Sequence, residues 1–282
     1  MRNFDEFTIT EAVLERVATA PDPRMRLISE ALVRHLHAFV REVETTQAEW
    51  AAGIDFLTRT GQMCDDKRQE FILLSDTLGV SMQVDAINHR RPEGATETTV
   101  LGPFYVQGPP EFACGADISG GMTGQKLYVE GSVATLDGTP IAGAIVDVWH
   151  ADAEGSYDVQ RPGDLAGRGR LHTDAAGRFH FWTTRPAFYP VPHDGPVGQM
   201  LALQGRHPYR PAHVHFMIAA PDHETLVTHV FAEGDKYLDS DVVFGVKDSI
   251  IRPYTEHAPG TAPDGTLVGE RYATLSYDFR LK

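Results

Sequence analysis

The first part of the chain, up to residue 91, places apolar side chains at helical spacing. Asp22-Pro23 has the composition of a helix N-cap followed by the first helical residue. Behind it, apolar residues recur every three or four positions and form one face of a helix: Met25, Ile28, Leu32, Leu36, Phe39, Val40 and Val43. Thr46 and Glu49 have the spacing of a capping box and predict a second helix that continues through Leu57.

Two more helices are expected before the pattern changes. One covers residues 65–79, where Gly79 is a suitable stop, and the other covers residues 81–89 and ends before Pro92. The apolar faces of the four helices have two possible uses. They either pack against each other in a bundle or pair with a second subunit.

After an irregular connector at residues 92–104, short β-type runs replace the helical pattern. They occur at residues 126–136, 143–149, 179–182, 213–219 and 225–231, and turn residues such as Asp137-Gly138 separate them. The proline-rich stretch 185–211 is expected to be a long ordered loop with a functional role. The pattern predicts an α+β protein, with a helical domain at residues 1–104 and an antiparallel β-sandwich at residues 105–282.

Composition narrows the range of functions. The chain has 282 residues, 42% of them hydrophobic, which is enough for a sizeable core. Its formal net charge of −14 repels phosphate backbones and anionic lipids, so neither nucleic-acid binding nor membrane binding is expected. The two cysteines, Cys64 and Cys114, are too few for a cysteine-rich zinc site. The N-terminus has no apolar leader segment, and a cytoplasmic protein is expected.

The strongest chemical signal is the pair His213 and His215. Residues at i and i+2 of a strand point to the same side, so this pair supplies half of a metal site or forms a polar outer face. With Asp222 or Glu224, the pair would make a ferrous facial triad. The sequence contains neither H-E-x-x-H nor G-x-S-x-G, which argues against a zinc protease and a serine hydrolase.

Several motifs resemble those of the intradiol ring-cleaving dioxygenases of the catechol 1,2-dioxygenase type. They occur in the family's order at residues 101–105 (LGPFY), 140–144 (PIAGA), 148–152 (VWHAD), 155–157 (GSY), 186–190 (PAFYP) and 210–216 (RPAHVHF). Each motif is short, but the ordered set is specific. The resemblance covers roughly residues 65–250, and the helical first half followed by a sandwich also matches the family.

The resemblance implies a ferric ion, Fe(3+), bound by Tyr157, Tyr189, His213 and His215. Phenolates are hard anionic donors that suit Fe(III), and a trivalent cation stabilises the phenolate form. The implied reaction cleaves an aromatic diol with O2 between its two hydroxyl-bearing carbons. Tyr189 would also accept a substrate proton, and the cation of Arg210 would stabilise developing negative charge.

One position departs from the catechol enzymes. His229 lies fourteen residues after His215, where those enzymes usually have a glutamine near the arginine. A histidine can still donate a hydrogen bond there. Either the catalytic role is kept by a different donor, or the pocket differs.

The segments 73–79 (LLSDTLG), 99–104 (TVLGPF) and 237–241 (YLDSD) are more similar to the hydroxyquinol branch of the family. This similarity implies the substrate hydroxyquinol (benzene-1,2,4-triol) and the product 3-hydroxy-cis,cis-muconate or maleylacetate, with catechol or a chlorocatechol as the alternative substrate. The implied pocket residues are Leu73, Asp76, Val100, Leu101, Gly102, Pro103, Phe104, Val191, Pro192 and Arg210.

Asp76 is the chemically distinctive member of this set. Its carboxylate could accept a hydrogen bond from the third hydroxyl, or it could be an ordinary solvated or helix-end carboxylate. Leu101 stands where some hydroxyquinol enzymes have phenylalanine, which would widen the pocket for a chlorine or methyl substituent.

The resemblance also implies a homodimer formed through the N-terminal helices, and it allows for a lipid held in an apolar tunnel there. Two other classes of protein compete with this interpretation. One is a non-catalytic module on a prealbumin-like sandwich, and the other is a ferrous extradiol-type oxygenase. Both would be almost colourless, whereas a ferric site with two tyrosinates would absorb visible light.

Overall fold

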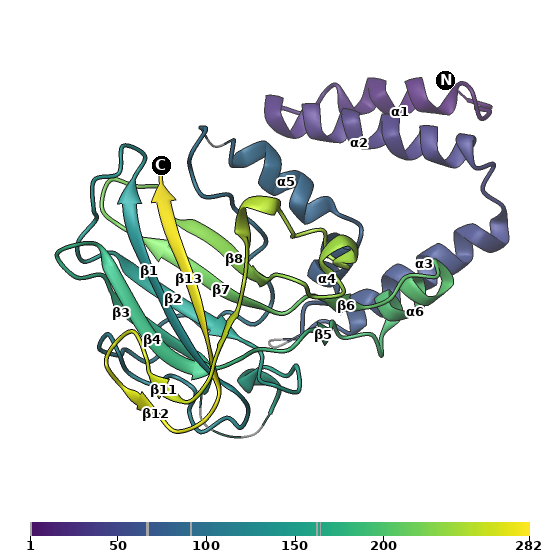
Figure 1. The fold of residues 1–282 in the computed structure, drawn as a ribbon. Coiled ribbons are helices and arrows are strands. Elements are labelled where there is room, and N and C mark those ends of the chain that lie inside the picture. Colours follow the sequence, from purple (N-terminus) through teal and green to yellow (C-terminus); the bar gives the residue numbers. More distant parts are fainter. Residues whose placement is uncertain (1, 66–67, 91, 162, 164) are drawn as a thin grey trace. The chain divides into compact units, whose positions relative to one another are not determined.

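The computed structural model describes residues 2–65, 68–90, 92–161, 163 and 165–282. The chain divides into two compact units, Met1–Arg59 and Thr60–Lys282. The first unit contains α1 (Ile9–Val17), α2 (Pro23–Glu42) and most of α3 (Gln47–Gln62), and Figure 1 labels these and the later elements. No helix among the described residues is long and apolar enough to cross a membrane.

The two predicted N-terminal signals of the first unit are confirmed. The Asp22 carboxylate accepts a hydrogen bond from the Met25 amide at 2.7 Å, and Pro23 is the first residue of α2. Thr46 and Glu49 form a reciprocal capping box before α3, with N···O distances of 2.8 and 3.2 Å. Helix α1, which lacks a side-chain cap, was not singled out from the sequence.

The second unit begins with two short helices, α4 (Glu70–Thr77) and α5 (Val80–Asn88). The helix expected from residue 65 begins later, at Glu70, and ahead of it the Asp65 carboxylate accepts the Arg68 amide proton at 2.7 Å. Residues 66 and 67 of that prediction lie outside the described residues. Gly79 ends α4 as predicted and has a φ of +74°, which a glycine adopts without strain.

The strands of the second unit follow a connector that has no regular structure in its described residues. In chain order they are β1 (Lys126–Thr135), β2 (Ile145–His150), β3 (Arg168–His172), β4 (Arg178–Thr184), β5 (Tyr189–Pro190), β6 (Tyr209–Arg210), β7 (His213–Ala219), β8 (Leu226–Ala232), β9 (Ile251–Arg252), β10 (Thr255–His257), β11 (Gly260–Thr261), β12 (Leu267–Val268) and β13 (Tyr272–Leu281). Single 3₁₀ turns occur at Asp158–Gln160, Leu238–Ser240 and Asp248–Ile250.

Two sheets pack face to face, as the sandwich prediction requires. Their strand orders are β10-β13-β1-β4 and β3-β2-β7-β8-β9, and Figure 1 shows β1, β4 and β13 in front of β2, β7 and β8. The core between them is aromatic and aliphatic. The ring centroid of Phe279 in β13 lies 6.1 Å from that of Phe179 in β4. It lies 4.9 Å from the ring centroid of Phe216 in the opposite sheet.

The predicted antiparallel sandwich is confirmed, and two of its strand pairs are parallel. β1 pairs with the C-terminal strand β13 in parallel register, and β8 pairs with β9 in parallel. The long loop at 185–211 also contains α6 (Pro196–Leu203), which begins with a proline in its first turn. A short helix flanked by Gly195 and Pro208 has too few residues to show a helical period in the sequence.

The core generates a stability prediction for Phe279, which is fully buried. Replacing Phe279→Ala leaves a cavity between the sheets and should lower the free energy of unfolding by about 3–5 kcal/mol. Phe279→Leu should lower it by less, because part of the volume remains filled. Urea unfolding measures both, and Leu203→Ala, at a side chain 90% exposed, is the control expected to change little. Equal losses for Phe279→Ala and Leu203→Ala would contradict this packing.

Candidate active site

Strand β7 presents two imidazoles on one face. His213 and His215 are both buried, and their Nε2 atoms lie 3.1 Å apart. The Nδ1 atom of His213 lies 2.7 Å from the carbonyl oxygen of Pro211, so Nδ1 is the protonated donor and Nε2 keeps its lone pair. The pairing of β7 with β2 places Trp149 opposite His215, and the indole stacks on that imidazole with ring centroids 4.5 Å apart.

Tyr157 follows the turn after β2. The Asp152 carboxylate shapes this turn by accepting the amide protons of Glu154 and Ser156 at 3.0 and 2.8 Å. Gly155 has a φ of +83°, and a Cβ atom added to it would lie 2.8 Å from the Cβ of Tyr189. Glycine therefore permits both the turn and the close approach of the two tyrosine-bearing segments.

Tyr189 begins the short strand β5, which pairs with β6. The pairing places Tyr189 directly opposite Arg210. The Tyr157 and Tyr189 hydroxyl oxygens lie 3.3 Å apart, although 31 residues separate the two tyrosines in the sequence. The 185–211 stretch therefore contributes to the site, as the sequence suggested for this loop.

The four predicted metal ligands converge. The Tyr157 hydroxyl oxygen lies 2.8 Å from the His215 Nε2 atom and 3.5 Å from the His213 Nε2 atom, in addition to its contact with Tyr189. Two phenol oxygens and two imidazole nitrogens therefore surround one point in the buried part of the protein. This donor set fits a metal ion that prefers oxygen and nitrogen ligands.

His229 adds a third imidazole to the same place. Together with His213 and His215 it forms a cluster whose possible ligand nitrogens all lie within 4.8 Å of one another. It is the β8 partner of His215, so the hairpin register brings it to the same face. The described residues of this cluster include no carboxylate, so the structure does not support the facial triad with Asp222 or Glu224.

His229 differs from the other two in its hydrogen bonding. Its Nδ1 atom is in short contact with the Thr99 hydroxyl, and within the described part of the chain its buried Nε2 atom has no hydrogen-bond partner. That nitrogen is available either to a metal ion or to a ligand in the site. The sequence identified the residue but not its support, because Thr99 lies 130 positions away.

Burial keeps the three histidines and Tyr157 neutral. It lowers the pKa of His213, His215 and His229 well below the ordinary histidine range, and the neighbouring Arg210 cation lowers all three further. Neutral imidazoles retain a lone pair for a metal. Burial, followed by the charge of Tyr189, raises the pKa of Tyr157 well above its usual range, so ionising this phenol needs a strong cation beside it.

Arg210 is the buried cation of the site. Its Nη1 atom lies 3.4 Å from His213 Nε2, and its Nε atom lies 3.1 Å from the Asp241 carboxylate. Burial lowers the pKa of Arg210, but the neighbouring Asp241 carboxylate raises it by more. The pKa of Arg210 therefore lies above its ordinary value. Asp241 also accepts the Gly245 amide proton at 2.9 Å, which fixes the carboxylate in place. The sequence placed Arg210 in the site but did not identify its partner.

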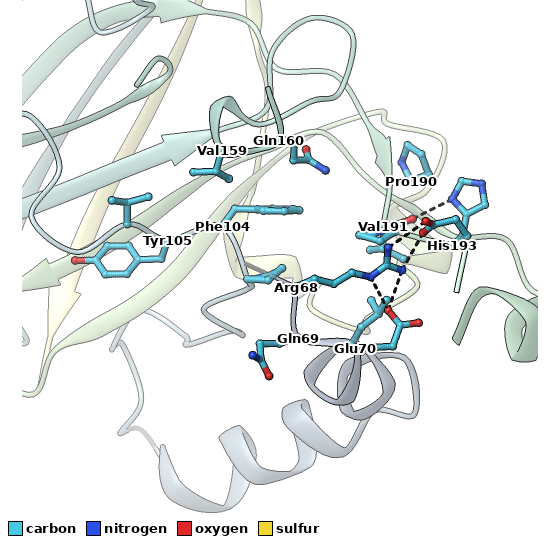
Figure 2. Close-up of a pocket in the computed structure, with 15 residues that line it drawn as sticks. Arg68, Gln69, Glu70, Phe104, Tyr105, Val159, Gln160, Pro190, Val191 and His193 are labelled. Atoms are coloured by element: carbon cyan, nitrogen blue, oxygen red, sulfur yellow. Dashed lines mark hydrogen bonds and ion pairs between the residues drawn. The ribbon is translucent and has the colours of Figure 1, made fainter. Parts of the chain in front are cut away.

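A cavity of about 860 Å³ is lined by neighbours of the two tyrosines, Phe104 and Pro190. Figure 2 shows Phe104 in its middle, and the Phe104 ring stacks on Tyr157 with centroids 4.3 Å apart. Five of the predicted pocket residues line this cavity: Leu73, Pro103, Phe104, Val191 and Pro192. Its size is within the range of small-molecule sites.

The remaining predicted pocket residues lie near the site without lining this cavity in the described part of the chain. Gly102 lies against the predicted ligand His215, because an added Cβ would be 3.5 Å from the His215 Cε1 atom. Val100 packs with Leu73 and Val191, and Leu101 is 40% exposed. Asp76 is buried, and burial raises the pKa of its carboxyl while the Ser81 hydrogen bond and the Arg210 charge act against the rise.

Several lining residues were not identified from the sequence. Tyr105 tilts against Trp149 and donates a hydrogen bond to the Asp147 carboxylate at 3.0 Å. Arg68 and Gln160 also line the cavity. Tyr105 and Trp149 lie inside the motifs quoted above, which was an available signal, whereas nothing around Arg68 or Gln160 marks them.

Comparisons with known proteins identify the family of this chain. A family model described as "Catechol dioxygenase N terminus" matches residues 22–96, and one described as "Dioxygenase" matches residues 100–282. The chain is 57% identical to 6-chlorohydroxyquinol 1,2-dioxygenase of Cupriavidus pinatubonensis, over 93% of this chain and 95% of that protein. It is 49% identical to hydroxyquinol 1,2-dioxygenase of Corynebacterium glutamicum, over 98% and 93% of the two chains.

Solved structures of similar proteins indicate the same family. Hydroxyquinol 1,2-dioxygenase from Pseudomonas putida DLL-E4 is 48% identical and superposes with a TM-score of 0.92, covering 98% of each chain. Catechol 1,2-dioxygenase from Pseudomonas arvilla C-1 is 32% identical with a TM-score of 0.83, covering 97% of this chain and 90% of that one. The sequence, the fold and the buried site agree, and the chain belongs to the intradiol dioxygenase family.

Proposed function

We propose that this intradiol dioxygenase binds Fe(III) through Tyr157, Tyr189, His213 and His215 and cleaves hydroxyquinol with O2 between its adjacent hydroxyl-bearing carbons. The observation that supports this most directly is the convergence of the four side chains, whose polar atoms lie 2.8 to 3.5 Å apart beside the cavity. The product would be 3-hydroxy-cis,cis-muconate or its tautomer maleylacetate.

The donor set favours ferric iron. Two phenol oxygens become hard anionic ligands when a trivalent cation lowers their pKa, and two neutral imidazoles complete the set. The bound ion would act as a Lewis acid and as a template for the two adjacent oxygens of the diol. Burial of all four side chains favours this, because the charges of Arg210 and Arg168 only partly offset the rise that burial causes in the pKa of Tyr157.

The other side chains have roles that their positions support. Tyr189 is held by the two-residue ribbon of β5 and β6, and we assign it the proton of a substrate hydroxyl. Arg210 is fixed by Asp241 beside His213, where a permanent cation stabilises negative charge that develops on the diol. His229 has a buried Nε2 atom without a partner in the described chain, which suits a hydrogen bond to substrate oxygen.

The choice of hydroxyquinol rests on the relatives and on Asp76. Relatives named for hydroxyquinol or 6-chlorohydroxyquinol cleavage share 48–57% identity, whereas a named catechol enzyme from Candida albicans shares 36%. Asp76 is buried one helical turn after Leu73, which lines the cavity, and the charge of Arg210 reaches its carboxylate. A carboxylate at this position would accept a hydrogen bond from the third hydroxyl. The 57% relative makes a chlorinated hydroxyquinol the second candidate.

The helical part supports an assembly proposal. Helix α2 has no buried residue in the described chain, and large apolar side chains along it are about half exposed: Met25, Leu27, Ile28, Leu32, Leu36, Phe39, Val40 and Val43. We infer that this stripe pairs two copies of the chain, with a lipid as a further possible occupant. The division into a helical domain at residues 1–104 and a catalytic domain at residues 105–282 stays a prediction, as does the cytoplasmic location.

Turnover tests the proposed function. The protein reconstituted with ferric iron should consume hydroxyquinol and O2 in equal amounts and release 3-hydroxy-cis,cis-muconate or maleylacetate, identified by mass spectrometry. Catechol and 6-chlorohydroxyquinol are assayed alongside it. A product cleaved beside the diol, or preferred cleavage of catechol, would contradict the proposal.

Asp76 supplies a specificity prediction. Asp76→Asn removes the charged acceptor at nearly constant volume and should lower the ratio of kcat/KM for hydroxyquinol to that for catechol about tenfold, because catechol lacks the third hydroxyl. The control is Asp239→Asn at an exposed site. An unchanged ratio in Asp76→Asn would remove Asp76 from substrate recognition.

A further inference from the structure

One part of the cavity is lined by an ion-pair bridge to which the proposed reaction assigns no role. The Arg68 guanidinium contacts the Glu70 carboxylate at 2.9 Å and the Asp194 carboxylate at 2.8 Å. Glu70 also accepts the Val197 amide proton at 3.2 Å, at the start of α6. The bridge therefore joins the segment before α4 to the loop before α6, which are 126 residues apart in the sequence.

All three charged residues of the bridge line the cavity. Figure 2 shows the Arg68 side chain reaching from beneath Phe104 toward Val191 and Glu70, on the opposite side of Phe104 from Gln160. Phe104 stacks on Tyr157, and Pro190 and Val191, which follow Tyr189 directly, line the same cavity. A ring substituent that points away from the tyrosines therefore enters the space that the bridge borders.

The bridge has a net negative charge. Arg68 contributes one positive charge, which is shared between the two carboxylates of Glu70 and Asp194. The described cavity lining contains no other arginine and no lysine. Tyr105, which also lines the cavity, is neutral at pH 7, because burial and the Asp147 carboxylate raise its pKa to about 12.

The buried cations Arg210 and Arg168 cannot serve an anionic substituent either, because each is paired with a carboxylate, Arg168 with that of Asp158. Arg210 is paired with Asp241 at 3.1 Å, and neither side chain is more than 3% exposed.

A carboxylate on the aromatic ring would lose its hydration on entering the cavity and gain no unpaired arginine or lysine in return. The histidine of the lining, His193, uses its Nδ1 atom in a hydrogen bond with the Val191 carbonyl oxygen at 3.1 Å and directly precedes the bridge's own Asp194 in the chain. A hydroxyl or a chlorine atom at the same ring position has no charge to desolvate.

We propose that the Arg68–Glu70–Asp194 bridge is a specificity filter that rejects diols with an anionic ring substituent, and that Asp194 supplies the discriminating charge. This inference rests on the proposed function, because it concerns substituents of the diol that the iron site would hold. Glu70 is fully buried and anchors the bridge, whereas the Asp194 side chain is 72% exposed. Asp194 can therefore be changed with little effect on packing.

The test compares two ligands of nearly the same shape, the anion 3,4-dihydroxybenzoate and the neutral 3,4-dihydroxybenzamide. Their inhibition constants against hydroxyquinol turnover are measured at low ionic strength for the unmodified enzyme, Asp194→Asn and Asp194→Ser. Asp248→Asn is the matched control, because Asp248 is exposed and does not line the cavity. Thermal unfolding confirms that each variant is folded.

We expect Asp194→Asn and Asp194→Ser to strengthen binding of the benzoate relative to the benzamide about tenfold, the size of one partly screened unit charge at this range. The gain should shrink as salt is added to 0.5 M, because screening shortens the reach of the Asp194 charge. Asp248→Asn should leave the ratio within about twofold. A ratio that does not move in either Asp194 variant, or that moves equally in Asp248→Asn, would overturn the filter.

This design separates the filter from the proposed function. If the unmodified enzyme fails to cleave hydroxyquinol, the proposed function fails. The dissociation constants of the two ligands, measured by calorimetry on the same iron-loaded proteins, then still decide whether the Asp194 charge discriminates between them.

Discussion

The structure depends on the convergence of two phenol oxygens and two imidazole nitrogens inside the protein. Burying four polar side chains at one point is costly unless they share a strong partner, and a trivalent cation is such a partner. Three local structures supply these four side chains. The β7 strand supplies the histidines, the Asp152 turn supplies Tyr157, and the β5–β6 ribbon supplies Tyr189.

These local structures differ in rigidity. The histidines belong to the central strand of a five-stranded sheet and are backed by the Trp149 ring. Tyr189 belongs to a ribbon with two residues in each strand, which has little stability of its own. The buried pair of Arg210 and Asp241 anchors the other strand of that ribbon. Two rigidly placed histidines and the less rigidly placed Tyr189 suit a site in which one ligand would be displaced by the substrate.

The sequence predicted the parts of this account that depend on local pattern. Spacing alone placed His213 and His215 on one face, and family motifs selected Tyr157 and Tyr189 among nine tyrosines. Contacts between residues that are distant in the sequence could not be predicted from local pattern. Examples are Arg210 with Asp241, His229 with Thr99 and Arg68 with Asp194. The parallel pairing of β1 with β13 was missed for the same reason, because strand order is a property of the whole chain.

The central claim is the ferric site with two tyrosine ligands, and the visible spectrum tests it most directly. Iron-loaded protein should show a broad tyrosinate-to-iron band that moves to longer wavelength when hydroxyquinol is added without oxygen. Tyr157→Phe should weaken and shift the band by removing one of its two sources. A colourless protein that contains stoichiometric iron would contradict tyrosine ligation, and with it the account of how this chain holds and cleaves its substrate.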